Sequence, residues 1–371
     1  MECSDAPCTR RGLCNARKGC GRILGSHPLQ QKGRVSFVVL VPPTSISVLT
    51  PATSANLGPG FDSLGLALQL YNRFDVEIGG RDPYTPQIEV HGEAGSGLST
   101  GPDNLFFRAF ALLFERRQVA LPAVKIRMTI SIPPGCGLGS SATAVVGGLM
   151  AANELLSMRD RSLAVPKEDL LAPAVEMEAG NHPDNVAPAL LGGLVATTVV
   201  DGETRAVKTR FPDVLKAVVF TPSFPMDTVA GRKLLPAAYP KADVTFNTGR
   251  VALLLTALQT GHYEVIGEAM QDRLHQPYRQ ALFPAMPAII EAAVAAGAYG
   301  ASLSGGGSSL IALASKNFHP ILQSMQETAR SLGIEGKGMI LSADQHGARI
   351  IAPHKRSRKK KGYYHAPGTL V

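Results

Sequence analysis

The sequence predicts an α+β fold in two unlike halves that divide near residues 205–212. In the first half, segments with the two-residue period of a strand alternate with segments of helical spacing. Past residue 210 the composition changes to long apolar helices and short strand-like runs. A length of 371 residues also exceeds the roughly 250–300 residues at which a single core stops growing.

The first half contains three predicted strands and three predicted helices. "PATSANLGPGFD" (51–62) interrupts them early, and its Gly58-Pro59-Gly60 predicts a loop with a sharp turn. Asp103 is the expected N-cap of the first helix, and the second helix is apolar on nearly all sides, which predicts burial. "AGNHPDN" is expected to break the chain after the third helix. The predicted strands are 45–50, 75–78 and 124–132, and the predicted helices are 101–117, 140–156 and 167–178.

The second half is predicted to be built from two helices and two strand regions. The second region, "ASLSGGGSSLIALA", reads as a strand, a glycine turn and another strand, which would point its loop at the first domain. The predicted strand regions are 214–222 and 301–314, and the predicted helices are 248–260 and 284–296.

The net charge of +8 lies at the two ends of the chain. Residues 1–34 carry +5 and residues 355–361 carry +6, which leaves the middle at −3. Charge runs of this kind are usually solvated tails, so we expect an extension over 1–44 and a basic tail over 353–371. The acidic middle argues against a nucleic-acid-binding core, and no apolar run approaches the ~20 residues of a membrane span.

Four of the five cysteines fall within the first 20 residues without the paired spacing of a zinc site. Their distribution indicates a reducing compartment, so we expect a cytoplasmic protein. The segment 1–44 is also rich in arginine and poor in acids, as transit peptides are, which leaves a plastid location open.

The most informative motif is "PPGCGLGSSATA" (133–144), which follows a predicted strand and opens a predicted helix. Its glycines allow backbone amides to approach an anion closely, and the helix N-terminus adds about half a positive charge there. Ser140 and Ser141 suit an N-cap, a phosphate donor or a magnesium ligand. No lysine follows Gly139, so this is not a Walker A loop, and the glycine spacing is not that of a Rossmann motif.

Two further glycine motifs, 51–62 and "SLSGGGSSL" (302–310), also follow predicted strands. Three such loops in one chain indicate that they converge on one charged ligand. Asn56 and Asp62 flank the first of these glycine turns at a strand end, where binding sites collect.

An acidic cluster lies between the second and third glycine motifs. Glu176, Glu178, His182, Asp184 and Asn185 suit magnesium or an ammonium group better than zinc, which prefers more histidine or cysteine ligands. Downstream, Arg232 and Arg279 are candidates for a carboxylate clamp, although either alone reads as a surface arginine.

The three glycine motifs resemble, in order, the signature motifs of the galactokinase–homoserine kinase–mevalonate kinase (GHMP) superfamily, over roughly residues 45–352. "HPDNVAPALLGG" and "QDRLHQPYR" are similar to the homoserine kinase branch. The resemblance implies two domains, 45–210 and 211–352. The first would contain a left-handed β-α-β crossover, and the second would be ferredoxin-like.

The resemblance also implies ATP- and Mg²⁺-dependent phosphorylation of the side-chain hydroxyl of L-homoserine, giving O-phospho-L-homoserine for threonine synthesis. It further implies a small-molecule substrate and a homodimer, and the composition above leads us to expect no membrane partner and no nucleic acid at the core. It assigns the catalytic residues as Asp184, Asn56, Ser141 and Glu178, and the substrate residues as Asn56, Asp62, His182, Asp184, Arg232 and Arg279. It assigns the ATP residues as Asn104, Pro134, Gly135, Cys136, Gly137, Leu138, Gly139, Ser140, Ser141, Ser304, Gly305 and Gly306, and the magnesium ligands as Ser140 or Ser141 with Glu178.

One departure concerns the magnesium ligand. Family members commonly read Glu-Gly-His-Pro-Asp-Asn, whereas "EAGNHPDN" here has two extra residues between the acid and the histidine. Glu176 therefore remains an alternative to Glu178. Asp184 is open to two roles, receiving the substrate ammonium or acting as a general base.

Two other readings remain open. The chain would act on mevalonate or a sugar if it belonged to another branch, or it would be a ligand-binding member without catalysis.

Overall fold

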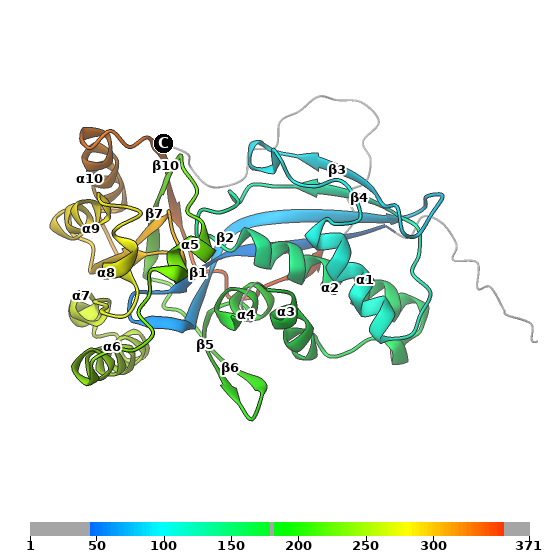
Figure 1. Cartoon of the computed structure of the whole chain (residues 1–371), viewed down its shortest axis with the longest axis horizontal. Coiled ribbons are helices and arrows are strands. Elements are labelled where there is room, and N and C mark those ends of the chain that lie inside the picture. The colour runs from blue at the N-terminus through cyan, green and yellow to red at the C-terminus, as the bar shows by residue number, and fades with distance from the viewer. Residues whose placement is uncertain (1–44, 179–181, 352–371) are drawn as a thin grey trace, which may run out of the picture. The chain divides into compact units, whose positions relative to one another are not determined.

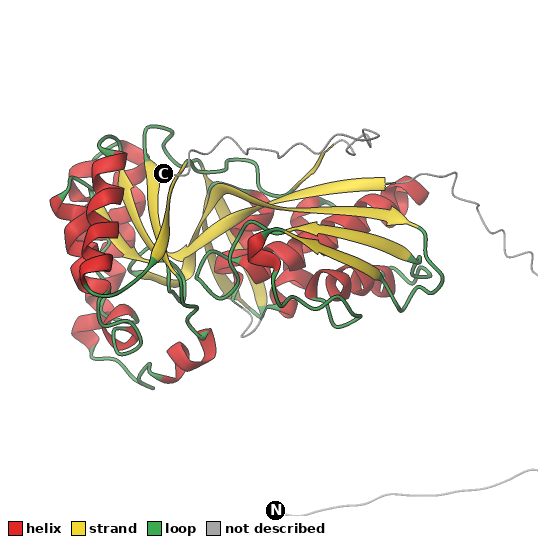
Figure 2. Ribbon diagram, turned by 90° about the horizontal axis from the view of Figure 1, so that it is seen from above, coloured by secondary structure: helices red, strands yellow, loops and turns green. Residues whose placement is uncertain are grey.

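The computed structural model describes residues 45–178 and 182–351 (Figure 1). The expectations for residues 1–44 and 353–371 lie outside the described residues. Within the described ranges, strands and helices form two sheets and their helical layers, as predicted for an α+β fold (Figure 2). None of the helices described is long and apolar enough to cross a membrane.

A seven-stranded sheet contains the first half of the described chain. Its order is β11-β1-β2-β4-β3, with β5 on β2 and β6 on β5. β3 and β4 are parallel and are joined through helix α1, whereas the other pairs are antiparallel. Its strands are β1 (Ser45–Asn56), β2 (Gly60–Ile78), β3 (Gln87–His91), β4 (Val124–Thr129), β5 (Leu194–Val200), β6 (Glu203–Thr209) and β11 (Arg349–Ile351). The helices along this part of the chain are α1 (Leu105–Arg116), α2 (Ser140–Arg159), α3 (Leu171–Met177) and α4 (Pro183–Leu191).

A four-stranded antiparallel sheet contains most of the second half, with the order β10-β7-β9-β8. Its order along the chain is strand, helices, two strands, helix and strand, which is the βαββαβ arrangement of ferredoxin-like folds. Its strands are β7 (Lys216–Pro222), β8 (Gly300–Leu303), β9 (Leu310–Ala314) and β10 (Gly336–Leu341). The helices are α5 (Thr228–Lys233), α6 (Lys241–Thr260), α7 (Ile266–Ala269), α8 (Gln276–Arg279), α9 (Met286–Ala295) and α10 (Phe318–Ser331). The predicted division at 210/211 falls where the chain leaves the first sheet, but β11 returns to it, so the boundary stays a prediction.

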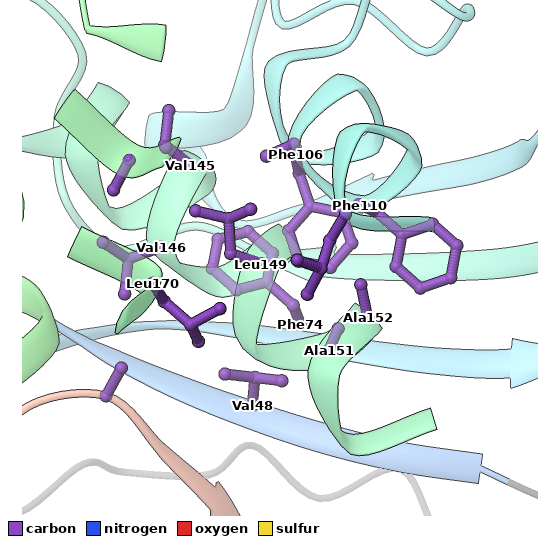
Figure 3. Packing of buried hydrophobic residues seen from close by; sticks show 14 of the residues in the cluster. Val48, Phe74, Phe106, Phe110, Val145, Val146, Leu149, Ala151, Ala152 and Leu170 are labelled. Carbon is purple, nitrogen blue, oxygen red and sulfur yellow. The ribbon is translucent and has the colours of Figure 1, made fainter. Parts of the chain in front are cut away.

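Three hydrophobic clusters connect these layers. In the first, α1 and α2 pack on the seven-stranded sheet, where the rings of Phe74 and Phe106 stack with centroids 4.6 Å apart (Figure 3). The second lies between the two sheets and joins one face of β7 and β9 to β2, α6 and α7. The third joins the opposite face of β7 and β9 to α9 and α10. The middle cluster therefore links the two sheets on which the site is built.

Most of the predicted elements occur, with three corrections. Residues 51–62 are not a loop, because β1 and β2 form a long hairpin that leaves only residues 57–59 as its turn. Asp103 is not the N-cap of α1, because the Asn104 side chain accepts hydrogen bonds from Phe106 N and Phe107 N, at 3.0 and 3.3 Å. The break expected over "AGNHPDN" (179–185) extends too far, because α4 begins at Pro183, where proline is tolerated in the first turn; residues 179–181 lie outside the described residues.

We predict opposite effects for two helical Gly→Ala changes. At Gly148 of α2 a Cβ would lie 2.2 Å from the Phe106 carbonyl oxygen, whereas at Gly249 of α6 nothing lies within 4 Å. Gly249→Ala should raise the free energy of unfolding by about 0.5–1 kcal/mol through helix propensity. Gly148→Ala should lower it by about 1–3 kcal/mol, because α1 and α2 must separate. Urea unfolding of both variants checks this; equal stabilisation by both would contradict the close packing of α1 on α2.

Candidate active site

A cleft of about 410 Å³ is lined by residues of all three glycine motifs and by the acidic cluster except Glu176. Its wall is formed by Asn56 and Asp62 on either side of the β1–β2 turn, the glycine loop before α2, the start of α4 and the loop between β8 and β9, together with α5 and α8. The convergence predicted from the three motifs is therefore found in the structure.

The glycine loop presents its amides and not its carbonyls. The carbonyl oxygens of residues 135–138 each accept a hydrogen bond of 2.6–3.1 Å from a neighbouring segment. The donors are, in that order, Met226 N, Ser309 N, Ser304 Oγ and Thr53 N. Within the described chain, no amide of residues 135–142 donates a hydrogen bond to another residue. A row of free amides at a helix N-terminus is a site for an oxyanion.

Backbone conformation produces this arrangement. Gly135, Gly137 and Gly139 have φ values of 69°, 76° and 68°, which only glycine adopts without strain. At Gly137 a Cβ would lie 2.2 Å from the Ser304 carbonyl oxygen, so the loop lies directly on the β8–β9 loop. Any side chain there would separate the two loops.

A buried asparagine that sequence reasoning missed holds the base of this loop. Asn72 on β2 accepts hydrogen bonds from Ser131 N and Ile132 N, at 2.9 and 3.1 Å, and donates to Thr143 Oγ1 at 2.8 Å. It thereby ties β2 to both ends of the loop. Asparagine is depleted inside strands, so one in the middle of a long strand would have been the available signal.

The two loop serines have different partners. Ser140 Oγ donates to the Ile132 carbonyl oxygen at 3.1 Å and so braces the loop. Ser141 Oγ donates to Glu178 Oε1 at 3.0 Å across the cleft. Burial raises the pKa of the Glu178 carboxyl, although the Ser141 hydrogen bond opposes that rise. Glu176, in contrast, forms a surface ion pair with Arg116 and does not line the cleft.

One end of the cleft carries two arginines and two carboxylates. Arg232 forms a two-point ion pair with Asp62, with Nη1–Oδ2 and Nη2–Oδ1 distances of 3.1 and 2.6 Å, and His182 Nδ1 lies 3.4 Å from Asp62 Oδ2. Burial raises the pKa of Asp184 to about 7, and the negative charge of Asp62 adds to the rise. Burial lowers the pKa of His182, so it stays neutral near pH 7. Arg279 is only 1% exposed and donates from Nη1 to the Gly305 carbonyl oxygen at 2.9 Å.

Asn56 joins two of the motifs. Its Oδ1 accepts from Asp62 N, and its Nδ2 donates to the Gly305 carbonyl oxygen, both at 3.0 Å. Asn56 and Asp62 both have positive φ, 72° and 55°, in the hairpin turn region. Their local strain is held by this network, which fixes the carboxylate of Asp62 in the cleft.

Another part of the cleft lining is largely apolar, although Ser99 and Asp103 also belong to it. Leu98, Leu105, Met128 and Ile130 line it beside Asn104. The Asn104 side chain is used internally, because it caps α1 and donates to the Ser99 carbonyl oxygen at 2.6 Å. Sequence reasoning missed these apolar residues, which look like ordinary core positions along the chain.

All but four of the sequence-predicted site residues line the cleft. The exceptions are the alternative metal ligand Glu176, which lies on the surface, and Cys136, Leu138 and Ser304, which support the cleft from behind. Leu138 lies in the cluster between the sheets, and the buried Ser304 Oγ donates to Gly137 O at 2.6 Å and lies 2.8 Å from Ser54 Oγ. Cys136 is buried, with its carbonyl oxygen bonded to Ser309 N.

The arrangement has a clear chemical capacity. The free amides suit a polyanion, the Ser141–Glu178 pair suits a cation beside that anion, and the paired charges suit a small molecule with charges of both signs. The described residues contain no group of three or more His, Cys, Asp or Glu side chains arranged to hold a metal ion.

Comparisons with known proteins agree with this geometry. The GHMP kinases N terminal domain model matches residues 104–193, and the GHMP kinases C terminal model matches residues 254–339. A homoserine kinase of Microchaete diplosiphon is 43% identical over 82% of this chain and 97% of its own length. One from Carboxydothermus hydrogenoformans is 40% identical over 84% and 98%.

Solved structures are similar as well. The crystal structure of homoserine kinase from Cytophaga hutchinsonii superposes with a TM-score of 0.75 at 29% identity, covering 84% of this chain and 99% of that one. A mevalonate kinase from L. major, at 19% identity and a TM-score of 0.61, covers 81% and 96% and shares the fold.

Proposed function

The chain belongs to the homoserine kinases of the GHMP kinase family, and from this premise we propose how its own residues phosphorylate the side-chain hydroxyl of L-homoserine with ATP. The proposal is based on the row of amides over residues 135–142 at the N-terminus of α2, which donate to no other described residue. We assign the β- and γ-phosphates of ATP to these amides. The adenine would occupy the apolar end of the cleft beside Leu105 and Met128.

Homoserine is assigned to the charged end. As a zwitterion it matches a wall of two arginines and two carboxylates, whereas mevalonate and sugars have no ammonium group to place there. Arg279 would bind the substrate carboxylate. Arg232 would bind it as well, while keeping part of its interaction with Asp62. Asp184 is the better candidate for the ammonium, because Asp62 is already paired with Arg232 and Asp184 is not in an ion pair among the described residues.

The mechanism follows from positioning and charge. Phosphoryl transfer has a loose transition state whose charge spreads over the transferred oxygens, so the loop amides and the α2 N-terminus would stabilise it without moving. Holding both ends of homoserine directs its hydroxyl at the γ-phosphate, and such orientation contributes about 7–11 kcal/mol to lowering the barrier. Asp184 serves binding in this account and is not required as a base.

Magnesium fits the residues present. Ser141 and Glu178 would supply a hydroxyl and a carboxylate beside the phosphates, the oxygen ligands that Mg²⁺ prefers. A bound ion would neutralise phosphate charge.

We propose that the protein is located in the cytoplasm, or in a plastid if residues 1–44 are a transit peptide. We also propose that it forms a homodimer.

The substrate assignment predicts a selective assay. ADP release measured with L-homoserine, mevalonate, galactose and no acceptor should rise above background with homoserine alone. Comparable release with mevalonate or galactose, or none with homoserine, would contradict the assignment.

A magnesium titration distinguishes the roles of Glu178 and Glu176. Glu178→Gln should raise the Mg²⁺ concentration for half-maximal activity by roughly 10–100-fold, because a ligand is lost. Glu176→Gln is the matched control and should leave it unchanged, since this carboxylate pairs with Arg116 on the surface. If Glu176→Gln instead raised the Mg²⁺ requirement and Glu178→Gln did not, Glu176 would be the metal ligand.

Asp184→Asn should raise the KM for homoserine by roughly 10–100-fold with little change in kcat, because an amide cannot balance the ammonium. Since the pKa of Asp184 is about 7, the neutral acid dominates below pH 7. The wild-type kcat/KM for homoserine should therefore rise as the pH increases through 7, and this limb should vanish in the variant.

Asp243→Asn is the control for this prediction, because Asp243 pairs with Arg273 outside the cleft. A loss of kcat of roughly 10²–10⁴-fold at saturating homoserine, with KM unchanged, would instead make Asp184 a general base.

A further inference from the structure

A fully buried histidine lies directly behind the proposed carboxylate clamp. His275 comes immediately before α8, and its ring is 0% exposed. Its Nε2 lies 2.7 Å from the Gly58 carbonyl oxygen in the β1–β2 turn, and its Nδ1 lies 3.1 Å from Arg279 Nη1. The imidazole therefore connects the hairpin turn to the arginine.

These contacts fix the tautomer of His275. Both groups near Nε2 are acceptors, the Gly58 carbonyl and, at 3.4 Å, the Asp272 carboxylate, so Nε2 carries the proton. A guanidinium only donates, so Nδ1 must keep its lone pair. Burial lowers the pKa of His275, in agreement with a neutral ring.

The position of the imidazole is itself fixed. The Asp272 carboxylate accepts hydrogen bonds of 2.7–3.1 Å from the amides of residues 274–276, and Asn247 Nδ2 donates to it at 2.8 Å. On the other side, the Phe61 ring stacks on the imidazole with centroids 5.2 Å apart and 21° between the planes. The ring therefore has no freedom to follow Arg279 if the arginine moves.

The guanidinium of Arg279 is consequently held at one nitrogen. Its Nη1 is shared between His275 and the Gly305 carbonyl oxygen, at 3.1 and 2.9 Å. Its buried Nε donates to no other described residue. The face of Phe61 lies 5.5 Å from the Arg279 guanidinium carbon and 5.4 Å from that of Arg232. One end of the guanidinium is thus anchored, and donors remain for a ligand in the cleft.

We propose that His275 is a positioning residue that, through Nδ1, holds Arg279 in the orientation that selects an acceptor carrying a carboxylate. The inference rests on the proposed function, because it assigns the substrate carboxylate to Arg279. The imidazole touches no substrate atom. It acts by keeping the arginine from turning into the cleft or toward other acceptors.

The test compares two acceptors that differ only in the carboxylate. L-homoserine and propanolamine, which has hydrogen in place of the carboxylate, are assayed for ADP release, and the ratio of their kcat/KM values measures the clamp. His275→Leu should lower this ratio by roughly 10–100-fold, as expected for losing a hydrogen bond to a charged group. The KM for ATP should stay unchanged, since the phosphate loop is not involved.

Two conservative variants identify the atom responsible. His275→Asn places an amide oxygen near the position of Nδ1 and should keep the ratio within about threefold of the wild type. His275→Gln retains a donor toward Gly58 but no acceptor near Arg279, and it should behave like His275→Leu. These two variants decide the matter if the leucine variant does not fold.

Two further variants distinguish a positioning role of His275 from a general loss of stability. Ile321→Ala, in the core between α10 and the four-stranded sheet, should lower stability without changing the ratio. Adding His275→Leu to Arg279→Leu should produce no further fall. The inference would be overturned if kcat/KM fell equally for both acceptors, or if the asparagine and glutamine variants gave the same ratio. It would also be overturned if the double variant had a lower ratio than Arg279→Leu alone. A wild type that releases no ADP with homoserine would overturn the proposed function as well, whereas an active wild type with an unchanged ratio in the variants overturns the inference alone.

Discussion

The site depends on hydrogen bonds that bind the carbonyl oxygens of the glycine loop from behind. Four consecutive carbonyls, over residues 135–138, are each bonded to a segment distant in the sequence. With the carbonyls directed into the protein, the amides of the same peptides are left unpaired. Unpaired amides cost free energy unless water or a ligand satisfies them, so the loop is built to be completed by an anion.

This constraint explains why the two sheets must be joined firmly. The donors to the loop come from β1 on one side, and from the chain after β7 and the β8–β9 loop on the other. If the sheets shifted, the carbonyls would lose these partners together. The hydrophobic cluster between the sheets, with the Asn56 bridge from the hairpin to Gly305, keeps them in register. The anion site therefore depends on the same packing that holds the two sheets together.

The charged end of the cleft follows a different rule. Arg232 and Asp62 neutralise each other, and burial pushes Asp184 toward its neutral form. Arg279, in contrast, is held by the neutral His275 and the Gly305 carbonyl oxygen and is in no ion pair with a described carboxylate. The substrate carboxylate would supply that partner, and an unpaired buried charge costs far more than a lost surface ion pair.

How much of this could be predicted depended on the range of the interactions. The glycine motifs and the buried α2 were predictable, because turn chemistry and periodicity are local signals. The extent of β1 and β2 was not, since their polar and glycine residues are held in strands by pairing across the sheet. The cap of α1 was misplaced by one residue, because aspartate and asparagine are about equally good capping residues, and the structure shows Ser99 donating to Asp103 instead.

Within the site, the types of residue could be predicted, but the role of each individual residue could not. The sequence left Ser140 and Ser141 both open as magnesium ligands and kept Glu176 as an alternative to Glu178, and their partners in space now distinguish them. The roles of Asn72 and His275 could not be assigned from the chain alone, because Asn72 bonds to the distant glycine loop and the His275 ring bonds to Gly58 in the distant hairpin turn.

The central claim is that the amides of residues 135–142 bind the triphosphate beside the amino-acid site. A crystal structure with a non-hydrolysable ATP analogue and L-homoserine tests it most directly. The account predicts phosphate oxygens within hydrogen-bonding distance of these amides, with the homoserine hydroxyl facing the terminal phosphate. Phosphates bound elsewhere while these amides contact only solvent would contradict it.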